Sequence, residues 1–189
     1  MADMIDVSSV QHPHNVAIDW KAVASSGVKA VMVKATEGAT YVNPWLVRDA
    51  EGAEAAGLWV GFYHFAHPSL SAPQAQIDAF IRAIGPLAHQ IGLALDIEEQ
   101  EGLSWPELAS WSHTFLTALR THTSWPILYS DRSWLEEMPG APFGGRLWLA
   151  SPGVHPTTRP YAWQMGTATV PGIARLVDVG QLYDMPVIH

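Results

Sequence analysis

The chain has 189 residues, of which 48% are hydrophobic and 15% are charged, so it is long enough for one domain that buries its own core. A formal charge of −8 argues against nucleic acid as a partner, because the phosphates would repel an acidic protein. The sequence contains no cysteine, which excludes disulfides, thiolate metal sites and cysteine nucleophiles.

Other features of the composition concern location and ligands. The longest uncharged apolar runs are far shorter than the roughly 20 residues of a membrane-spanning helix, so we expect no membrane insertion. The first residues, Met1 to Asp6, lack the basic and apolar regions of a secretory signal. We therefore expect either release during phage lysis or a secreted protein whose signal has been trimmed. The nine tryptophans indicate an aromatic core or a platform for flat ligands such as sugars.

Strand patterns recur through the first two thirds of the chain. The fourth is the most informative, because its apolar run from Gly92 stops abruptly in the carboxylates of Asp96 and Glu98. The other four strands are predicted at residues 4–8, 30–33, 59–65 and 127–130.

A helix pattern follows each of these strands. Ser71-x-x-Gln74 and Ser104-x-x-Glu107 have the spacing of capping boxes, so we expect each to begin a helix. The remaining predicted helices begin at Asp19-Trp20, extend from Trp45 to Ala56, and form a short turn from Ser133 to Met138.

Three last strands are predicted at 147–150, 161–164 and 175–178, separated by Pro- and Gly-rich gaps of only about ten residues. A parallel crossover needs a dozen or more residues, usually helical, so we expect these strands to pair largely antiparallel. The predicted fold is α/β, a single irregular TIM-like barrel of the form (β/α)5(β)3. A complete eightfold barrel usually needs about 250 residues, which fits the missing last helices and leaves 1–189 as a single domain.

Four acidic residues fall at or near predicted strand ends: Asp6, Asp96, Glu98 and Asp178. In α/β barrels the carboxyl ends of the strands form the active-site face, so we expect these acids to converge. Paired carboxylates are the minimum equipment for cleaving a glycosidic bond, since one acid protonates the leaving oxygen and another negative group faces the oxocarbenium-like carbon. Six further residues are predicted at the same rim, and together their flat rings and hydrogen-bonding groups resemble a carbohydrate cleft: Tyr63, His64, Tyr129, Trp148, Trp163 and Gln164.

Several motifs occur in order between about residue 4 and residue 183. The most specific are Lys34-Ala35-Thr36-Glu37-Gly38 and Leu95-Asp96-Ile97-Glu98; others are Asp6-Val7-Ser8-Ser9-Val10-Gln11, Ile18-Asp19-Trp20, the stretch from Gly57 to Phe65, Leu147-Trp148-Leu149-Ala150, Trp163-Gln164 and Val177-Asp178. Together they resemble the motifs of the glycoside hydrolase family 25 lysozymes, the Chalaropsis-type muramidases of bacteria, phages and fungi. Asn43 and Gly180 depart from residues that are frequent in that family.

The resemblance implies a (β/α)5(β)3 barrel that hydrolyses the β-1,4 bond between N-acetylmuramic acid and N-acetylglucosamine in bacterial peptidoglycan. It implies Glu98 as the catalytic acid, surrounded by Asp96, Asp6 and Asp178. The resemblance also includes phage endolysins, and an enzyme of this kind would need no cofactor or metal. We expect a monomer whose partner is the glycan strand.

The chemistry also follows from the residues. Burial and the charge of Asp96 should raise the pKa of Glu98 and keep it protonated, while Asp96 remains ionised. Asp96 could then stabilise an oxazolinium-like intermediate formed by the substrate's own N-acetyl group, the route that the resemblance favours. Direct attack by Asp96 and inversion through water stay open. Asp6 and Asp178 are expected to tune these pKa values or bind hydroxyls, and Lys34 is expected to pair with Glu37.

Two other function classes are compatible with a barrel. His12-Pro13-His14 and His64-x-x-His67 loosely resemble the metal ligands of amidohydrolase barrels, although no downstream set of ligands completes a site. Alternatively, the chain is a module that binds cell-wall glycan without cleaving it. A chelator would inactivate the first, and the second would release no reducing ends.

Overall fold

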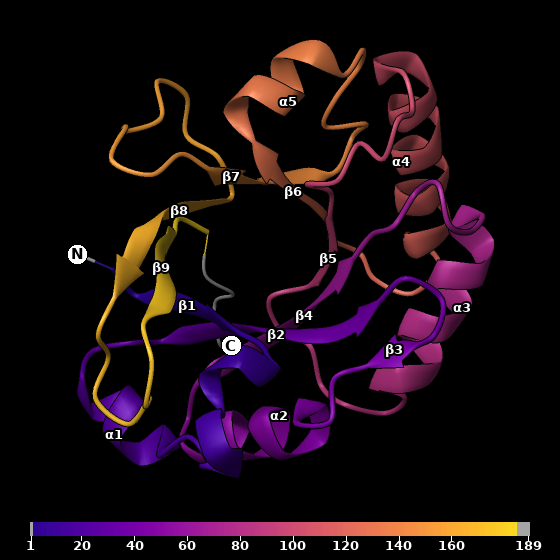
Figure 1. Ribbon diagram of the computed structural model, residues 1–189. Helices are drawn as coiled ribbons and strands as arrows, with labels where there is room; N and C mark the ends of the chain where they lie inside the picture. The colour runs from indigo at the N-terminus through magenta and orange to yellow at the C-terminus, as the bar shows by residue number, and fades with distance from the viewer. Residues whose placement is uncertain (1, 185–189) are drawn as a thin grey trace.

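The computed structural model describes residues 2–184, in which eight strands close a barrel (Figure 1). The order around the barrel is β1, β9, β8, β7, β6, β5, β4, β2, and the parallel pairing of β1 with β2 closes the ring. The short β3 extends the sheet beyond β2 as the second arm of a hairpin. The strands are β1 Met4–Val7, β2 Ala30–Glu37, β3 Tyr41–Val42, β4 Trp59–Phe65, β5 Leu93–Asp96, β6 Pro126–Asp131, β7 Arg146–Ala150, β8 Ala162–Ala168 and β9 Val177–Leu182.

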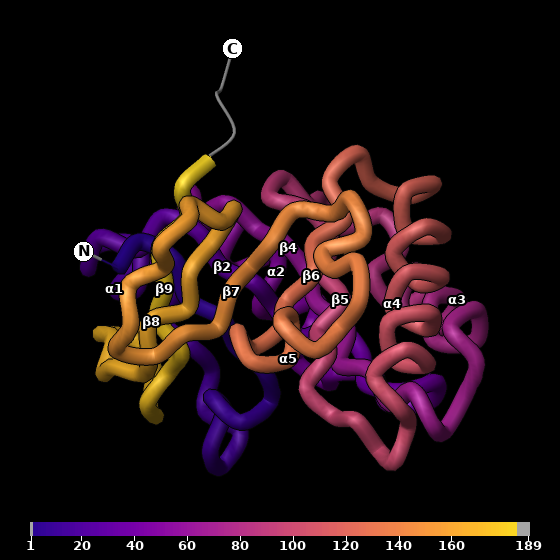
Figure 2. The backbone as a smooth tube through the Cα atoms, turned by 90° about the horizontal axis from the view of Figure 1, so that it is seen from above, coloured from indigo at the N-terminus to yellow at the C-terminus, as the bar shows by residue number. Residues whose placement is uncertain are grey.

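Five helices cover the outside of the barrel, and each follows one of the first five barrel strands. They are α1 Trp20–Ser25, α2 Leu46–Ala55, α3 Pro73–Ile84, α4 Trp105–Leu119 and α5 Arg132–Glu137. Helices α3 and α4 lie side by side, whereas β8 and β9 lie on the opposite side of the barrel without a helical cover (Figure 2). This arrangement confirms the predicted (β/α)5(β)3 barrel. None of the helices in the described part of the chain is both long and apolar enough to cross a membrane.

The prediction for the last strands is only partly correct. β8 and β9 pair antiparallel, as do β9 and β1, but β7 pairs parallel with both β6 and β8. The segment 151–160 returns the chain to the start of β8 without a helix, using turns such as the bond from Val154 N to Ser151 O. The expectation was wrong for β7 and β8 because an irregular loop, instead of the usual helix, connects these two parallel strands.

The helix starts test the two predicted capping boxes. At α4, Ser104 and Glu107 form the reciprocal bonds of a capping box. At α3 the prediction was wrong, since the helix begins at Pro73 with Ala72 as the N-cap. Proline at the first helical position fixes the start, and the Ser71 hydroxyl instead accepts a bond from the buried Gln76 amide.

Alternation along the strands separates two apolar layers. Outward residues pack under the helices, whereas inward residues fill a narrow barrel interior that contains Ala30, Met32 and Ala94. Gly61 also faces inward, and a Cβ there would lie 2.6 Å from Met32 Sδ and 2.8 Å from Ile91 Cγ1. The absence of a side chain at Gly61 therefore leaves the space that Met32 and Ile91 fill.

Candidate active site

Four acidic side chains meet at the mouth of the barrel. Asp96 ends β5 and Glu98 follows two positions later, while Asp6 on β1 lies directly opposite Asp178 on β9. Beyond the effect of burial, Asp178 raises the pKa of Asp6 and of Glu98, and Glu98 and Asp6 raise that of Asp96. The four carboxyl groups are therefore close enough at the mouth of the barrel to raise one another's pKa.

Asp96 and Glu98 differ in environment. Asp96 is 5% exposed, and its Oδ1 is buried without a hydrogen-bond partner among the described residues, whereas Glu98 is exposed. Burial raises the pKa of Asp96 well above its usual value, and the charges of Glu98 and Asp6 raise it further. Burial also raises the pKa of Glu98, but a hydrogen bond between the two carboxyl groups lowers it. In the unliganded protein, burial therefore favours the neutral form of Asp96, which differs from the expectation that Asp96 stays ionised.

Asp6 belongs to a short chain of hydrogen bonds. Its Oδ2 accepts a bond of 3.0 Å from Gln164 Nε2, and Gln164 Oε1 accepts one of 2.9 Å from the Tyr129 hydroxyl. Tyr129 thus fixes the amide so that its NH2 group faces Asp6. Burial, with Asp178 as a second cause, raises the pKa of Asp6 to about 8. The carboxyl of Asp6 is therefore mostly protonated at neutral pH.

Three aromatic residues line the interior beside the acids. Tyr63, Tyr129 and Trp148 are buried, with ring centroids of Tyr129 and Trp148 4.5 Å apart and of Tyr63 and Trp148 6.2 Å apart. Trp148 Nε1 is buried without a partner among the described residues. An orphan donor there and an orphan acceptor on Asp96 are two buried polar atoms that a ligand could satisfy.

Two residues predicted for the cleft lie elsewhere. His64 is fully buried, bonded to Thr36 Oγ1 and Gln76 Oε1 at 2.8 Å each, on the outer side of β4. Trp163 donates its Nε1 to Ser151 O at 3.1 Å and so anchors the loop before β8. Both predictions were wrong, because successive side chains of a strand point to opposite faces.

Lys34 brings a positive charge to the site from β2. Its Nζ lies 2.6 Å from Glu37 Oε2, which confirms the predicted ion pair, and 4.5 Å from the centre of the Phe65 ring. The ammonium group also lowers the pKa of Asp96 and Glu98, against the larger effect of burial. Sequence reasoning assigned Lys34 no role toward the acids, although its place in the Lys-Ala-Thr-Glu-Gly motif was a signal.

The family model for glycosyl hydrolases family 25 matches residues 5–169. The chain belongs to this family. The lysozyme M1 of Streptomyces globisporus is 30% identical over 92% of this chain, which spans 65% of that relative. The N,O-diacetylmuramidase of Chalaropsis sp is 32% identical over 71% of this chain and 68% of the relative. A solved bacterial lysozyme from Streptomyces coelicolor superposes with a TM-score of 0.84 at 29% identity, covering 96% of this chain and 91% of that one.

The two departures from frequent family 25 residues have structural explanations. Asn43 is buried, donates to Lys34 O at 2.7 Å and accepts from Trp45 N at 3.0 Å, so it joins the end of β2 to the start of α2. A Cβ at Gly180 would lie 2.6 Å from Trp163 O on the neighbouring strand. The partners of Asn43 and the neighbour of Gly180 in these contacts are not among the four acids.

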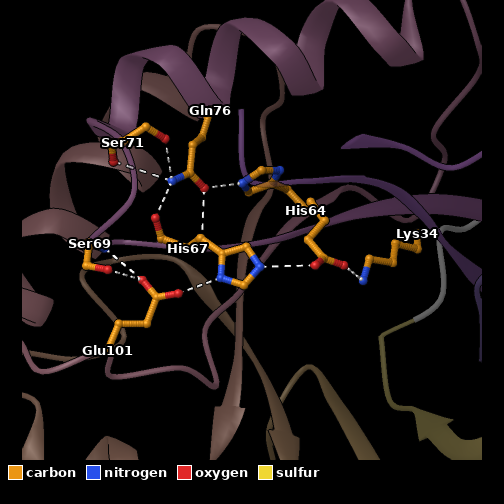
Figure 3. A network of polar contacts seen from close by, with 8 residues as sticks. Lys34, His64, His67, Ser69, Ser71, Gln76 and Glu101 are labelled. Atoms are coloured by element: carbon orange, nitrogen blue, oxygen red, sulfur yellow. Dashed lines mark hydrogen bonds and ion pairs between the residues drawn. The ribbon is translucent and has the colours of Figure 1, made fainter. Parts of the chain in front are cut away.

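The histidines proposed as metal ligands are engaged in other contacts. His12 bonds to Asp49 at 2.8 Å and to Val16 O at 3.0 Å, and its ring stacks on Trp45. His67 uses both ring nitrogens for carboxylates (Figure 3). Within residues 2–184, no three His, Cys, Asp or Glu side chains are arranged to hold a metal ion. Sequence reasoning missed this use of His67, because its partners come from distant loops.

Proposed function

We propose that this family 25 hydrolase is a lysozyme that cleaves the β-1,4 bond between N-acetylmuramic acid and N-acetylglucosamine in peptidoglycan. The observation that supports it best is the hydrogen-bonded pair of Asp96 and Glu98, one buried and one exposed, at the mouth of a family 25 barrel. The names of the relatives, lysozyme and N,O-diacetylmuramidase, support the same substrate class.

Glu98 is the proton donor in this proposal. Its exposed carboxyl can reach a glycosidic oxygen that enters from solvent, and burial raises its pKa, the direction that favours the protonated form a general acid needs. Glu98 gives its proton to the leaving oxygen, and afterwards accepts a proton from the water that hydrolyses the intermediate. Each turnover therefore restores the starting protonation state.

Asp96 stabilises the intermediate. Its unpartnered Oδ1 can accept the N–H of the substrate's N-acetyl group, whose carbonyl oxygen attacks the anomeric carbon as the leaving group departs. A donor on Asp96 favours its ionised form, so substrate binding shifts the shared proton toward Glu98. This shift reconciles the proton on Asp96 in the free protein with the role of Glu98 as the acid.

The remaining groups hold the substrate and set the charge of the site. A protonated Asp6 adds no negative charge at neutral pH, and Asp178 faces it across the β1–β9 pair. Tyr63 and Trp148 provide aromatic surface beside the sugar, and Gln164 orients Asp6.

We further propose that residues 1–189 act as a single catalytic domain and as a monomer on glycan strands, without a cofactor, and that phage-type release delivers the protein to the wall.

Mass spectrometry of digested peptidoglycan tests the activity. A new reducing N-acetylmuramic acid end supports it, and Glu98→Gln should release that product far more slowly. Reducing N-acetylglucosamine ends would refute a muramidase. Tight binding without reducing ends would identify a glycan-binding module, and activity lost to a chelator would favour the amidohydrolase.

A further inference from the structure

His67 lies between two carboxylates that come from different parts of the barrel rim. Its Nδ1 is 2.5 Å from Glu101 Oε1, in the segment after β5, and its Nε2 is 3.0 Å from Glu37 Oε1, at the end of β2 (Figure 3). Glu101 also accepts bonds of 2.8 Å from the backbone N–H and the hydroxyl of Ser69. The imidazole therefore joins the loops that follow three strands.

The backbone of His67 is held independently of its ring. Gln76 on α3 accepts from His67 N at 3.2 Å and donates to His67 O at 2.7 Å. Gln76 is completely buried, and Ser71 also accepts a bond from its amide. A change in the charge of the ring should therefore alter the contacts with Glu37 and Glu101 rather than the position of His67.

The segment that contains Glu98 is fixed at both ends. On one side, Ile97 N donates to Tyr129 O at 3.1 Å, and Ile97 O accepts from Ser130 Oγ at 2.8 Å. On the other side, the contacts of Glu101 with His67 and Ser69 are the next side-chain anchor along the chain. Glu98 lies between these anchors, only three residues before Glu101.

We infer that His67, in its protonated form, is a positioning residue that holds Glu98 in place through Glu101. This inference rests on the proposed function. An imidazolium donates from both nitrogens, so it can bond Glu37 and Glu101 at once. A neutral imidazole has one donor, and its other nitrogen would present a lone pair to a carboxylate. Deprotonation thus breaks one of the two bonds, and with it the bridge that ties the Glu98–Glu101 segment to Glu37 at the end of β2.

The charged groups around the ring determine when this happens. β2 contributes Glu37 and Lys34, the segment after β5 contributes Glu101, and β4 contributes the buried His64; α3 contributes the neutral Gln76. Burial lowers the pKa of His67, but the bonds to the two carboxylates outweigh it and raise the pKa above its usual value. The anchor is therefore complete between the lowered pKa values of Glu37 and Glu101 and the raised pKa of His67, and it is lost as pH rises through the latter.

Glu101→Gln tests the inference, since it keeps the size of the side chain and removes its charge. We expect an NMR titration to show the His67 midpoint lowered by on the order of one pH unit. The alkaline limb of kcat on peptidoglycan should move by the same amount, with KM nearly unchanged. Glu51→Gln, an equal change of charge on the exposed face of α2, should move neither.

A second background separates this effect from a direct field of Glu101 on Glu98. In a His67→Gln protein, adding Glu101→Gln should leave the alkaline limb of the kcat–pH profile unmoved, because no imidazole remains to titrate. An equal shift in both backgrounds would overturn the inference, as would a limb that stays still while the His67 midpoint moves. If the wild-type protein releases no reducing ends, the proposed function fails, but the amide resonances of residues 98–101 still test whether this segment follows the His67 midpoint.

Discussion

Asp6→Asn should change how stability depends on pH. In the folded protein the pKa of Asp6 is raised from 3.8 to about 8, so between about pH 4 and pH 8 the unfolded chain releases a proton that the folded chain keeps. Stability is therefore lost as pH rises through this window, at up to about 1.4 kcal/mol per pH unit for one proton. The full shift of about 4 units would amount to on the order of 5 kcal/mol.

Solvent contact and the other acids reduce this value, because Asp6 is only half-buried and shares the mouth with Asp178. We expect a few kcal/mol. Asparagine keeps an oxygen that can accept from Gln164, so the variant should lose little at pH 4 and become more stable than the wild type at pH 8. Urea denaturation at intervals from pH 4 to pH 8 measures both curves. A constant difference between them across this range would refute the reasoning.

Three other changes have distinct expected outcomes. Glu98→Gln should lower turnover on peptidoglycan by roughly 10²–10⁴-fold, about 3–5 kcal/mol of barrier, and an aryl glycoside with an activated leaving group should rescue it much better than it rescues Asp96→Asn. Gly61→Ala should destabilise the barrel by about 1–3 kcal/mol in urea denaturation, because its Cβ would overlap Met32 and Ile91; unchanged stability would contradict the packing. Raising salt toward 0.1 M should preserve or improve lysis by this chain of charge −8, and inhibition would point to a local basic patch.

The sequence predicted the acids better than the aromatic cleft. Asp96 and Glu98 are two positions apart, so period-2 geometry places them on one face without knowledge of the fold. The same rule shows why two cleft residues were misplaced. Tyr63 and His64 are adjacent, as are Trp163 and Gln164, so only one member of each pair can face the interior. The pairing of β7 and the proton on Asp96 depend on the path of a loop and on burial, which a local pattern does not contain.

The contact between Asp96 and Glu98 also has a stereochemical consequence. An inverting glycosidase separates its two carboxyl groups by about 6.5–9.5 Å to admit a water between them, but this pair is in hydrogen-bond contact and leaves no such space. We therefore expect retention, so the first product of a β-linked substrate should be the β-anomer. Proton NMR of the reducing end, recorded on soluble glycan fragments before mutarotation, measures this directly. An α-anomer at the earliest time would refute the retaining route and would require a base across the mouth, where Asp6 and Asp178 lie opposite each other.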